Sequence, residues 1–251
     1  MLNIILSLTF FVFASNTFDH AYKSWNSFLK THVKVEGPVS TVNYNAIKQN
    51  PESLNKILKD FSSVTKKQYD SFNSDQRLAF LINAYNAFTI KLIVDNYPVK
   101  SIKDIGSFSF SNLTASPWKK EFFNLLEQKR HLDNVEHDMI REWFKEPRIH
   151  FAVVCASIGC PKLQDQAYTG ENLNELLETA AKEFLNDKSR NRFENGTLKL
   201  SSIFKWYGDD FKNGVKIFVA PYMSEDKEMQ KNILKSDVEY LNYDWNLNEH
   251  K

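Results

Sequence analysis

A chain of 251 residues with 42% hydrophobic and 14% aromatic residues has enough apolar surface for one large folded domain or two small ones. Seven glycines and seven prolines are too few for a collagen-like or linker-rich protein. The 32 Lys and Arg nearly cancel the 31 Asp and Glu, and a net charge of +1 gives no electrostatic reason to expect binding to nucleic acid or to an anionic membrane.

The N-terminal segment predicts export from the cytosol. Residues 1–14 are almost wholly apolar, and polarity rises after them. As a helix this run would span only about 21 Å, less than the ~30 Å hydrocarbon core of a bilayer. We therefore expect a signal peptide over residues 1–15, with Val12 and Ala14 as small residues before the cleavage site. The alternative is a buried first element of the mature fold.

The predicted location is secreted or periplasmic, and residues 16–251 are expected to form a single globular domain. No fixed-period repeat and no low-complexity linker divides this part of the chain. No later stretch is expected to span a membrane, so no transmembrane segment should remain after signal removal.

Helices dominate the first part of the predicted domain. Apolar side chains recur at helical spacing within residues 17–70. The clearest helix follows, in NSDQRLAFLINAYNAFTIKLIVDNYP, where Ser74 is expected to cap the start and Pro98 ends the run. Its apolar residues cover most of its surface, so we expect it to be central. Asn83 and Asn86 lie on one face of it, and because buried amides cost free energy unless paired, they should hydrogen-bond a neighbouring loop or line a cleft.

The second part of the chain predicts shorter elements. A hairpin is expected over residues 122–132, and a helix should begin at Asp133, where Asp-x-x-Glu resembles a capping box. Residues 149–156, IHFAVVCA, read as a buried strand rich in β-branched residues. A helix over 171–185, a strand in GTLKLSS, a helical IFKWYGDDF and a helix from Val215 follow. The predicted class is α+β, helix-rich, with a small and mostly antiparallel sheet.

The two cysteines of the chain, Cys155 and Cys160, lie five positions apart in C-A-S-I-G-C-P. An exported chain enters an oxidising compartment, and a turn containing Gly159 and Pro161 can bring the two Cα atoms within disulfide distance. A catalytic thiolate at Cys155 is the second interpretation, because the residue lies where a predicted strand meets a turn and the strand would support it rigidly. Unpaired structural thiols are another alternative.

A thiolate needs a base or a cation nearby, and two histidines are candidates. Side chains alternate along a strand, so His150 would point away from the face that carries Cys155. His137, on the preceding predicted helix, is free of that constraint and is the preferred base. The residues that could orient its imidazole are Asn83, Asn86 and Glu136.

A zinc site is the third interpretation of the same residues. His137, His150, Cys155 and Cys160 are suitable ligand types, but their spacings do not match the usual C-x(2–4)-C pairs. Trp206 and Tyr207, with Asp209 and Asp210, could edge a binding cleft, although a helix that packs its aromatic residues into the core is the simpler interpretation.

Four blocks of the sequence, in order, resemble the domain of unknown function 547 family: DQRLAFLINAYNAFTIKLI, LDNVEHDMIREWF, EPRIHFAVVCASIGCPKL and LSSIFKWYGDDF. The resemblance covers about residues 40–220 and implies a family without a settled activity, found in many bacteria behind signal peptides and in plants beside coiled-coil segments. Such a set of Cys and His is similar to that of thiol hydrolases. The recurring polar positions that the resemblance implies are Asn83, Asn86, Glu136, His137, Arg148, His150, Cys155 and Cys160.

The leading hypothesis is therefore an exported thiol-dependent hydrolase or acyltransferase, with Cys155 as nucleophile and His137 as base. It requires no cofactor, and its ligand would be an unidentified small molecule or peptide. The alternatives are a non-catalytic binding or scaffold domain stapled by a Cys155–Cys160 disulfide, and a zinc-binding domain. The residues expected to assist catalysis are His150, Asn83, Asn86 and Glu136, and those expected to assist binding are Arg148, Cys160, Trp206 and Tyr207.

Overall fold

The structure, a computed structural model, describes residues 18–106 and 116–250. The predicted signal peptide over residues 1–15 lies outside the described residues. The fold is the predicted one in class, α+β and rich in helix, with small and mostly antiparallel sheets. The α-helices are α1 (Lys23–His32), α2 (Tyr44–Gln49), α3 (Glu52–Ser62), α4 (Lys66–Ser71), α5 (Ser74–Asn96), α6 (Glu142–Phe144), α7 (Leu173–Asn186), α8 (Ile203–Trp206), α9 (Val215–Met223) and α10 (Lys227–Lys235).

The described strands form separate small sheets where the sequence suggested one. Two are antiparallel hairpins, and in the third the middle strand pairs with one antiparallel and one parallel neighbour. The strands are β1 (Val33–Glu36), β2 (Val39–Val42), β3 (Phe123–Leu125), β4 (Gln128–Arg130), β5 (Arg192–Glu194), β6 (Thr197–Ser201) and β7 (Asp237–Leu241). The short 3-10 helices are η1 (Ile102–Asp104), η2 (Pro117–Lys119), η4 (Pro147–Phe151) and η5 (Gly208–Asp210), and η3 (Asn134–Arg141) is π-helical.

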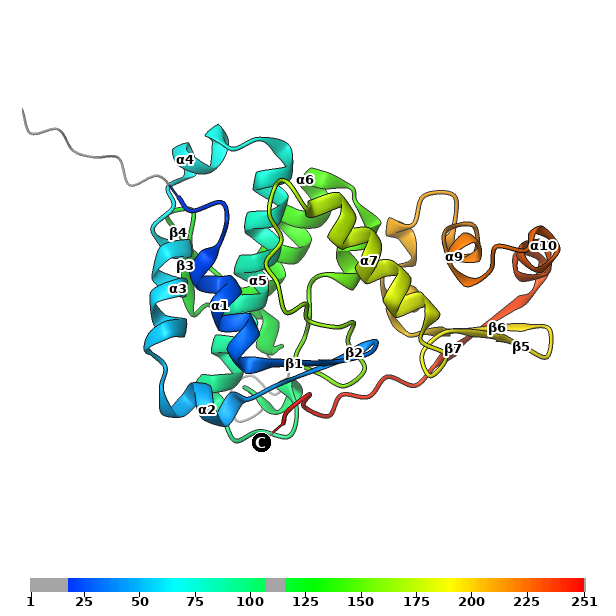
Figure 1. Ribbon diagram of the computed structural model, residues 1–251, viewed down its shortest axis with the longest axis horizontal. Coiled ribbons are helices and arrows are strands. Elements are labelled where there is room, and N and C mark those ends of the chain that lie inside the picture. Colours follow the sequence, from blue (N-terminus) through cyan, green and yellow to red (C-terminus); the bar gives the residue numbers. More distant parts are fainter. Residues whose placement is uncertain (1–17, 107–115, 251) are drawn as a thin grey trace, which may run out of the picture.

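Helix α5 is central, as its apolar surface predicted. It packs against α2, α3 and η3, and nearly every residue from Leu78 to Val94 is buried (Figure 1). The helix is long and apolar enough to cross a bilayer by length and composition, contrary to the expectation for the later sequence, but 89% of its most apolar window is buried inside the protein. Its cap is Asn73 rather than the expected Ser74: Asn73 Oδ1 accepts from Gln76 N at 2.8 Å, and Gln76 Oε1 accepts from Asn73 N at 3.0 Å.

The strand predicted over residues 149–156 is wrong. Residues Pro147–Phe151 form the 3-10 helix η4, and the chain then runs irregularly to Cys155. No described strand lies beside this segment, and the side chain of Asn86 takes the place of a strand partner, because it donates to Ala152 O at 2.9 Å and accepts from Val154 N at 3.0 Å. The side-chain alternation that set His150 apart from Cys155 therefore does not apply.

The helix expected from Asp133 is present as η3 followed by α6, but the predicted capping box is not formed. The Asp133 side chain makes no capping hydrogen bond. The π-helical turns of η3 widen the helix where Glu136 and His137 lie, a distortion that is common beside functional sites.

Two hydrophobic clusters make up the core. The larger one surrounds α5, and the smaller one gathers residues of α7, α8, α9 and β6. Helix α7 contributes to both, with Leu173 to Leu177 in the larger cluster and Ala180 to Leu185 in the smaller. Tyr243 packs against both clusters.

Residues 242–250, called the C-terminal strap below, return from β7 across the molecule to the side of β1, β2 and α2 (Figure 1). Along the way the strap pairs with the loop that carries the cysteines: Gly159 N donates to Asp244 O and Ile158 N to Asn246 O, both at 2.8 Å. Its end pairs with β2, where Val42 N donates to Asn248 O at 2.9 Å. The strap thus joins the start of the domain to the cysteine loop.

Candidate functional site

A cavity of about 300 Å³ lies where the two core clusters meet. It gathers side chains from α5, η3, η4, the cysteine loop, α8 and the strap. Its polar and sulfur-containing lining residues are Asp133, Glu136, His137, His150, Cys155 and Cys160. Its aromatic lining residues are Tyr85, Trp118, Trp206, Tyr207, Tyr243 and Trp245.

Cys155 and Cys160 are joined by a disulfide, with their Cα atoms 6.3 Å apart. Cys160 is buried and Cys155 is half-buried, so Cys155 is the more accessible of the two residues. Cys160 Sγ accepts from the backbone N–H of Cys155 at 2.9 Å and from the Tyr243 hydroxyl at 3.1 Å. Ser157 Oγ lies 3.1 Å from Cys155 Sγ and 3.4 Å from Cys160 Sγ. Hydroxyl groups therefore contact both sulfurs, and the backbone N–H donor points at Cys160.

Tyr243 is kept as a hydrogen-bond donor by its surroundings. Burial raises the pKa of its hydroxyl, and this outweighs the hydrogen bond from Ser157, which lowers it. Ser157 donates to Tyr243 Oη at 3.2 Å, which leaves the tyrosine proton for a sulfur. The Tyr243 hydroxyl lies 3.2 Å from Cys155 Sγ, so a single phenol contacts both halves of the disulfide.

The backbone of the cysteine loop is constrained at two positions. Ala156, directly after Cys155, has φ 59°, a left-handed conformation that costs a non-glycine residue roughly 1–2 kcal/mol. A Cβ on Gly159 would lie 2.9 Å from Asp244 O and 3.0 Å from Tyr243 Cδ1. Glycine is therefore needed for the strap, and with it Tyr243, to approach the cysteines this closely.

His150 is held by a carboxylate. Its Nε2 lies 2.7 Å from Asp210 Oδ2, and its ring stacks on Tyr207 with centroids 4.1 Å apart. Arg141 binds the same carboxylate with two N–H groups, at 2.6 and 2.8 Å. Burial alone would raise the pKa of Asp210, but the hydrogen bonds from His150 and Arg141 hold it below its ordinary value. Asp210 is consequently ionised at neutral pH and fixes the orientation of the His150 ring.

His137 has a defined hydrogen-bonding state. Arg141 Nη1 lies 2.8 Å from His137 Nδ1, and because a guanidinium can only donate, Nδ1 must accept. The proton of the neutral imidazole is then on Nε2, which lies 3.9 Å from Asp133 Oδ1. Burial raises the pKa of Asp133, and the interaction with His137 partly offsets this. In the described part of the chain, neither His137 nor His150 forms a hydrogen bond to a sulfur, so the expected Cys155–His137 pair is not in direct contact.

Glu136 is a buried carboxylate, 4% exposed, in the wall of the cavity. It lies beside the hydroxyls of Tyr85 and Tyr207, and burial together with the charge of Glu136 raises the pKa of both hydroxyls. Within residues 18–106 and 116–250 it forms no ion pair. A buried carboxylate without a cation partner is uncommon, since buried charges are normally paired.

Three of the predicted residues, Asn83, Asn86 and Arg148, are not among the residues that line the cavity. Asn83 binds the backbone of Tyr168, donating to its O at 2.6 Å and accepting from its N at 3.1 Å, and it also accepts from Trp25 Nε1. Asn86 braces the chain ahead of Cys155, as described above. Arg148 forms a two-point contact with Glu146 and further bonds to α7. Trp206 and Tyr207, expected to edge a binding cleft, do line the cavity.

Five lining residues with polar or aromatic side chains were not predicted. Tyr85 and Asp133 lie inside the sequence blocks already singled out, next to the polar residues that drew attention. The others had no such context, and the clustering of aromatic residues in N-Y-D-W-N near the C-terminus was the available signal for two of them. The missed residues are Tyr85, Trp118, Asp133, Tyr243 and Trp245.

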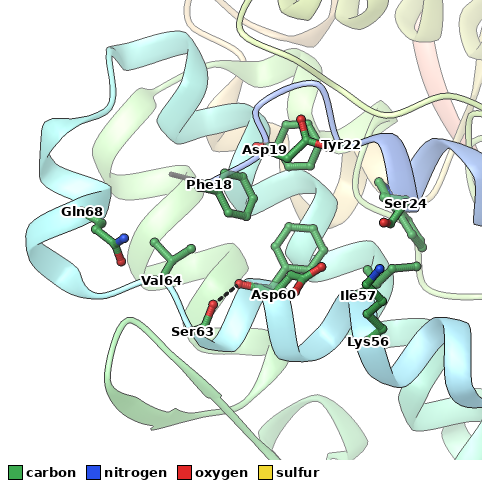
Figure 2. A pocket seen from close by; sticks show the side chains of 12 residues that line it. Phe18, Asp19, Tyr22, Ser24, Lys56, Ile57, Asp60, Ser63, Val64 and Gln68 are labelled. Carbon is green, nitrogen blue, oxygen red and sulfur yellow. Dashed lines mark hydrogen bonds between the residues drawn. The ribbon is translucent and has the colours of Figure 1, made fainter. Parts of the chain in front are cut away.

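A second cavity, of about 240 Å³, lies between α1 and α3 (Figure 2). Its wall includes Tyr22, Lys56 and Asp60, and none of the predicted site residues lines it. Among the described residues, no group of three or more His, Cys, Asp and Glu side chains is arranged to hold a metal ion. The cavity around the cysteines is the candidate site, because most of the predicted site residues line it.

One protein family, described as "Protein of unknown function, DUF547", matches residues 69–185. The matched part carries Glu136, both histidines and both cysteines, whereas Trp206, Tyr207 and the strap lie beyond it. The match is shorter than the range of about 40–220 expected from the sequence blocks. No curated protein and no solved structure matches the chain.

Proposed function

Residues 69–185 match the DUF547 family, and we propose that the cavity of this chain is a thiol-dependent catalytic site whose reaction is thiol–disulfide exchange at Cys155. The observation that carries this proposal is the set of donors around the disulfide: the backbone N–H of Cys155 and the Tyr243 hydroxyl both point at Cys160 Sγ. Such donors stabilise a thiolate, which makes Cys160 the better leaving group.

The exchange proceeds in two steps. A substrate thiolate attacks Cys155 Sγ, the Cys155–Cys160 bond breaks, and its electron pair remains on Cys160 as a thiolate. A second substrate thiolate then attacks the substrate sulfur of the mixed disulfide, which releases an oxidised substrate and leaves Cys155 as a thiolate. A small-molecule disulfide regenerates the Cys155–Cys160 bond by the reverse steps. The half-buried position of Cys155 and the burial of Cys160 fit these two roles.

Acyl transfer by reduced Cys155 is the second candidate function. It is favoured by the position of both histidines in the same cavity wall as Cys155, with His150 oriented by Asp210 as a catalytic base is oriented by its carboxylate. In this reaction Cys155 attacks an amide or related acyl group, and the disulfide is a resting form that must first be reduced. A small shift of either imidazole is required, because neither contacts a sulfur directly.

We also propose that the protein acts outside the cytosol, in the periplasm or secreted. The apolar run ahead of residue 16 supports export. The disulfide supports it independently, since such bonds persist mainly in oxidising compartments.

Trapping with a small disulfide tests the proposed exchange. In Cys160→Ser the single thiol is Cys155, and incubation with oxidised glutathione should give a mixed disulfide, detected by intact mass. Cys155→Ser leaves only the buried Cys160 and should react at least about tenfold more slowly. Equal rates in the two variants would remove the assigned roles.

Variants that keep both cysteines test the donors around the disulfide. Tyr243→Phe should slow the reduction of the Cys155–Cys160 bond by a monothiol, because one donor to Cys160 is lost. Tyr240→Phe, on the exposed side of β7, is the matched control and should react at the wild-type rate. Release of an amine or alcohol from an acyl substrate by reduced wild type, but not by Cys155→Ser, would favour acyl transfer instead.

A further inference from the structure

The lining of the cavity includes carboxylates but no lysine or arginine among the described residues. These carboxylates belong to Asp133 and Glu136. Arg141 interacts electrostatically with Glu136, but its guanidinium is held by Asp210 through two hydrogen bonds. His137 and Lys119 offset the charge of Asp133, so Glu136 is the lining carboxylate that forms no ion pair within the described residues.

Aromatic side chains make up much of the rest of the wall. We call Trp118, Trp206, Tyr243 and Trp245 the aromatic wall. The centroid of Trp245 lies 4.6 Å from that of Tyr243, 5.6 Å from that of Trp206 and 5.9 Å from that of Trp118. The interplanar angles of these pairs range from 32° to 72°, so the rings are inclined to one another rather than stacked in parallel.

Aromatic faces attract cations, and this wall already holds one at its outer side. The Lys103 ammonium lies 4.5 Å from the centroid of Trp245, and Lys103 is not among the residues that line the cavity. Boxes of several aromatic rings with a nearby carboxylate are the usual way in which proteins recognise alkylammonium groups.

From these features we propose that the cavity binds an alkylammonium group, and that the thiol or disulfide on which Cys155 acts carries such a group. The ammonium lies between the aromatic wall and Glu136, and completes the ion pair that the buried carboxylate lacks. The sulfur of the same compound then faces Cys155, which lines the same cavity. The first half of this proposal is independent of the proposed exchange reaction, and the second half rests on it.

Binding is tested first, with the full oxidised chain and two probes of the same shape, one positively charged and one neutral. Choline should bind and quench tryptophan fluorescence, whereas 3,3-dimethyl-1-butanol, its neutral isostere, should bind at least about tenfold more weakly. Equal affinity for the two compounds, or no binding of choline at millimolar concentration, would overturn the inference.

Two variants locate the bound cation. Trp206→Ala removes a half-exposed ring of the aromatic wall and should weaken choline binding by about threefold to tenfold, and Trp143→Ala, on α6 with 48% exposure against 45% for Trp206, should not change it. Glu136→Gln should weaken choline binding by about tenfold and leave the neutral probe unaffected. Circular dichroism separates this effect from misfolding. Wild-type affinity in both Trp206→Ala and Glu136→Gln would place the cation elsewhere and overturn the site.

The second half is tested with three disulfides that differ in charge. Reduced protein should react faster with cystamine, which carries two ammonium groups, than with bis(2-hydroxyethyl) disulfide, and slowest with dithiodiglycolate. Glu136→Gln should reduce the differences in rate among the three compounds. Equal rates for the three compounds would overturn the cation preference and leave the exchange reaction in place, whereas choline binding without any exchange would overturn the reaction and leave the cation site in place.

Discussion

Asp210 shows how a single residue organises one side of the cavity. Its carboxylate accepts hydrogen bonds from both His150 and Arg141, and Arg141 in turn fixes the proton of His137 on Nε2. One carboxylate therefore sets the position of both histidines. Asp210 lies in the fourth sequence block, LSSIFKWYGDDF, but the sequence did not link it to either histidine. Asp210 is a positioning residue in either proposed reaction.

Replacement of Asp210 by Asn should lower the stability of the protein in a pH-dependent way. The pKa of Asp210 is lower in the folded than in the unfolded state, so its charge stabilises the fold above the ordinary pKa of an aspartate, about 4, and this contribution is lost as the pH falls toward the folded-state pKa. We expect Asp210→Asn to cost about 1–2 kcal/mol at pH 7, and to differ less from wild type at pH 3. Urea unfolding across this range measures the difference.

The exposed neighbour Asp209 provides the control. Asp209→Asn should leave the unfolding free energy within about 0.5 kcal/mol of wild type at every pH, because surface substitutions rarely exceed that value. A loss in Asp210→Asn that is equally large at pH 3 and pH 7 would contradict the assignment of the charge.

At the scale of elements, the C-terminal strap builds the site as much as the family-matched part does. It brings Tyr243 to both sulfurs and Trp245 to the aromatic wall, and its backbone pairs with the cysteine loop and with β2. The close approach at Gly159 makes this possible, since the glycine N–H donates to Asp244 O at 2.8 Å with no side chain between the two segments.

Gly159→Ala should displace the strap. The new Cβ would lie 2.9 Å from a backbone oxygen, so the strap must move and lose its pairing, at a cost of about 1–3 kcal/mol. Hydrogen exchange of residues 242–250 should become faster, and reduction of the disulfide should change in rate as Tyr243 withdraws. Gly208→Ala is the matched control, because its Cβ would meet only Val215 Cγ2, at 3.9 Å. Protection of the strap that is unchanged in Gly159→Ala would contradict this account.

For the whole molecule, the cysteine pair adds little to a fold held by two hydrophobic clusters. The clusters contain most of the buried apolar residues, and the disulfide closes a loop with a sequence separation of only 5. Small loops restrict the unfolded chain less than long ones. The position of the bond in the cavity wall, rather than its contribution to folding, is consistent with a chemical role.

Reduction should therefore leave the protein folded. From loop closure alone we expect the reduced chain to lose about 2 kcal/mol of unfolding free energy while keeping its circular dichroism spectrum. Urea unfolding of the oxidised protein, the reduced protein and a Cys155→Ser/Cys160→Ser variant measures this, with the double variant as the control for effects of the reductant. Global unfolding on reduction would make the bond a structural staple and weaken the case for exchange.

The hydrophobic pattern of the sequence determined the helical elements and the α+β class, because burial of an apolar face is a local property of the chain with a readable period. It determined the central position of α5 for the same reason. It also predicted that the two amides of this helix must find partners, and Asn83 and Asn86 both bind backbone groups of distant segments. Chemistry-bearing residue types indicated the cysteines, Glu136 and the histidines as neighbours, and one cavity holds them.

Only the tertiary structure decided which groups touch the sulfurs. The segment IHFAVVCA has the composition of a strand, but no strand lies beside it in the described chain, and Asn86 satisfies its backbone instead. Tyr243, 83 residues after Cys160, reaches the disulfide through the strap, and Asp210 reaches His150 across 60 residues. Contacts of this separation depend on the path of the whole chain, and local propensity carries no information about that path. The residue types of the site were therefore readable in the sequence, whereas its partners were not.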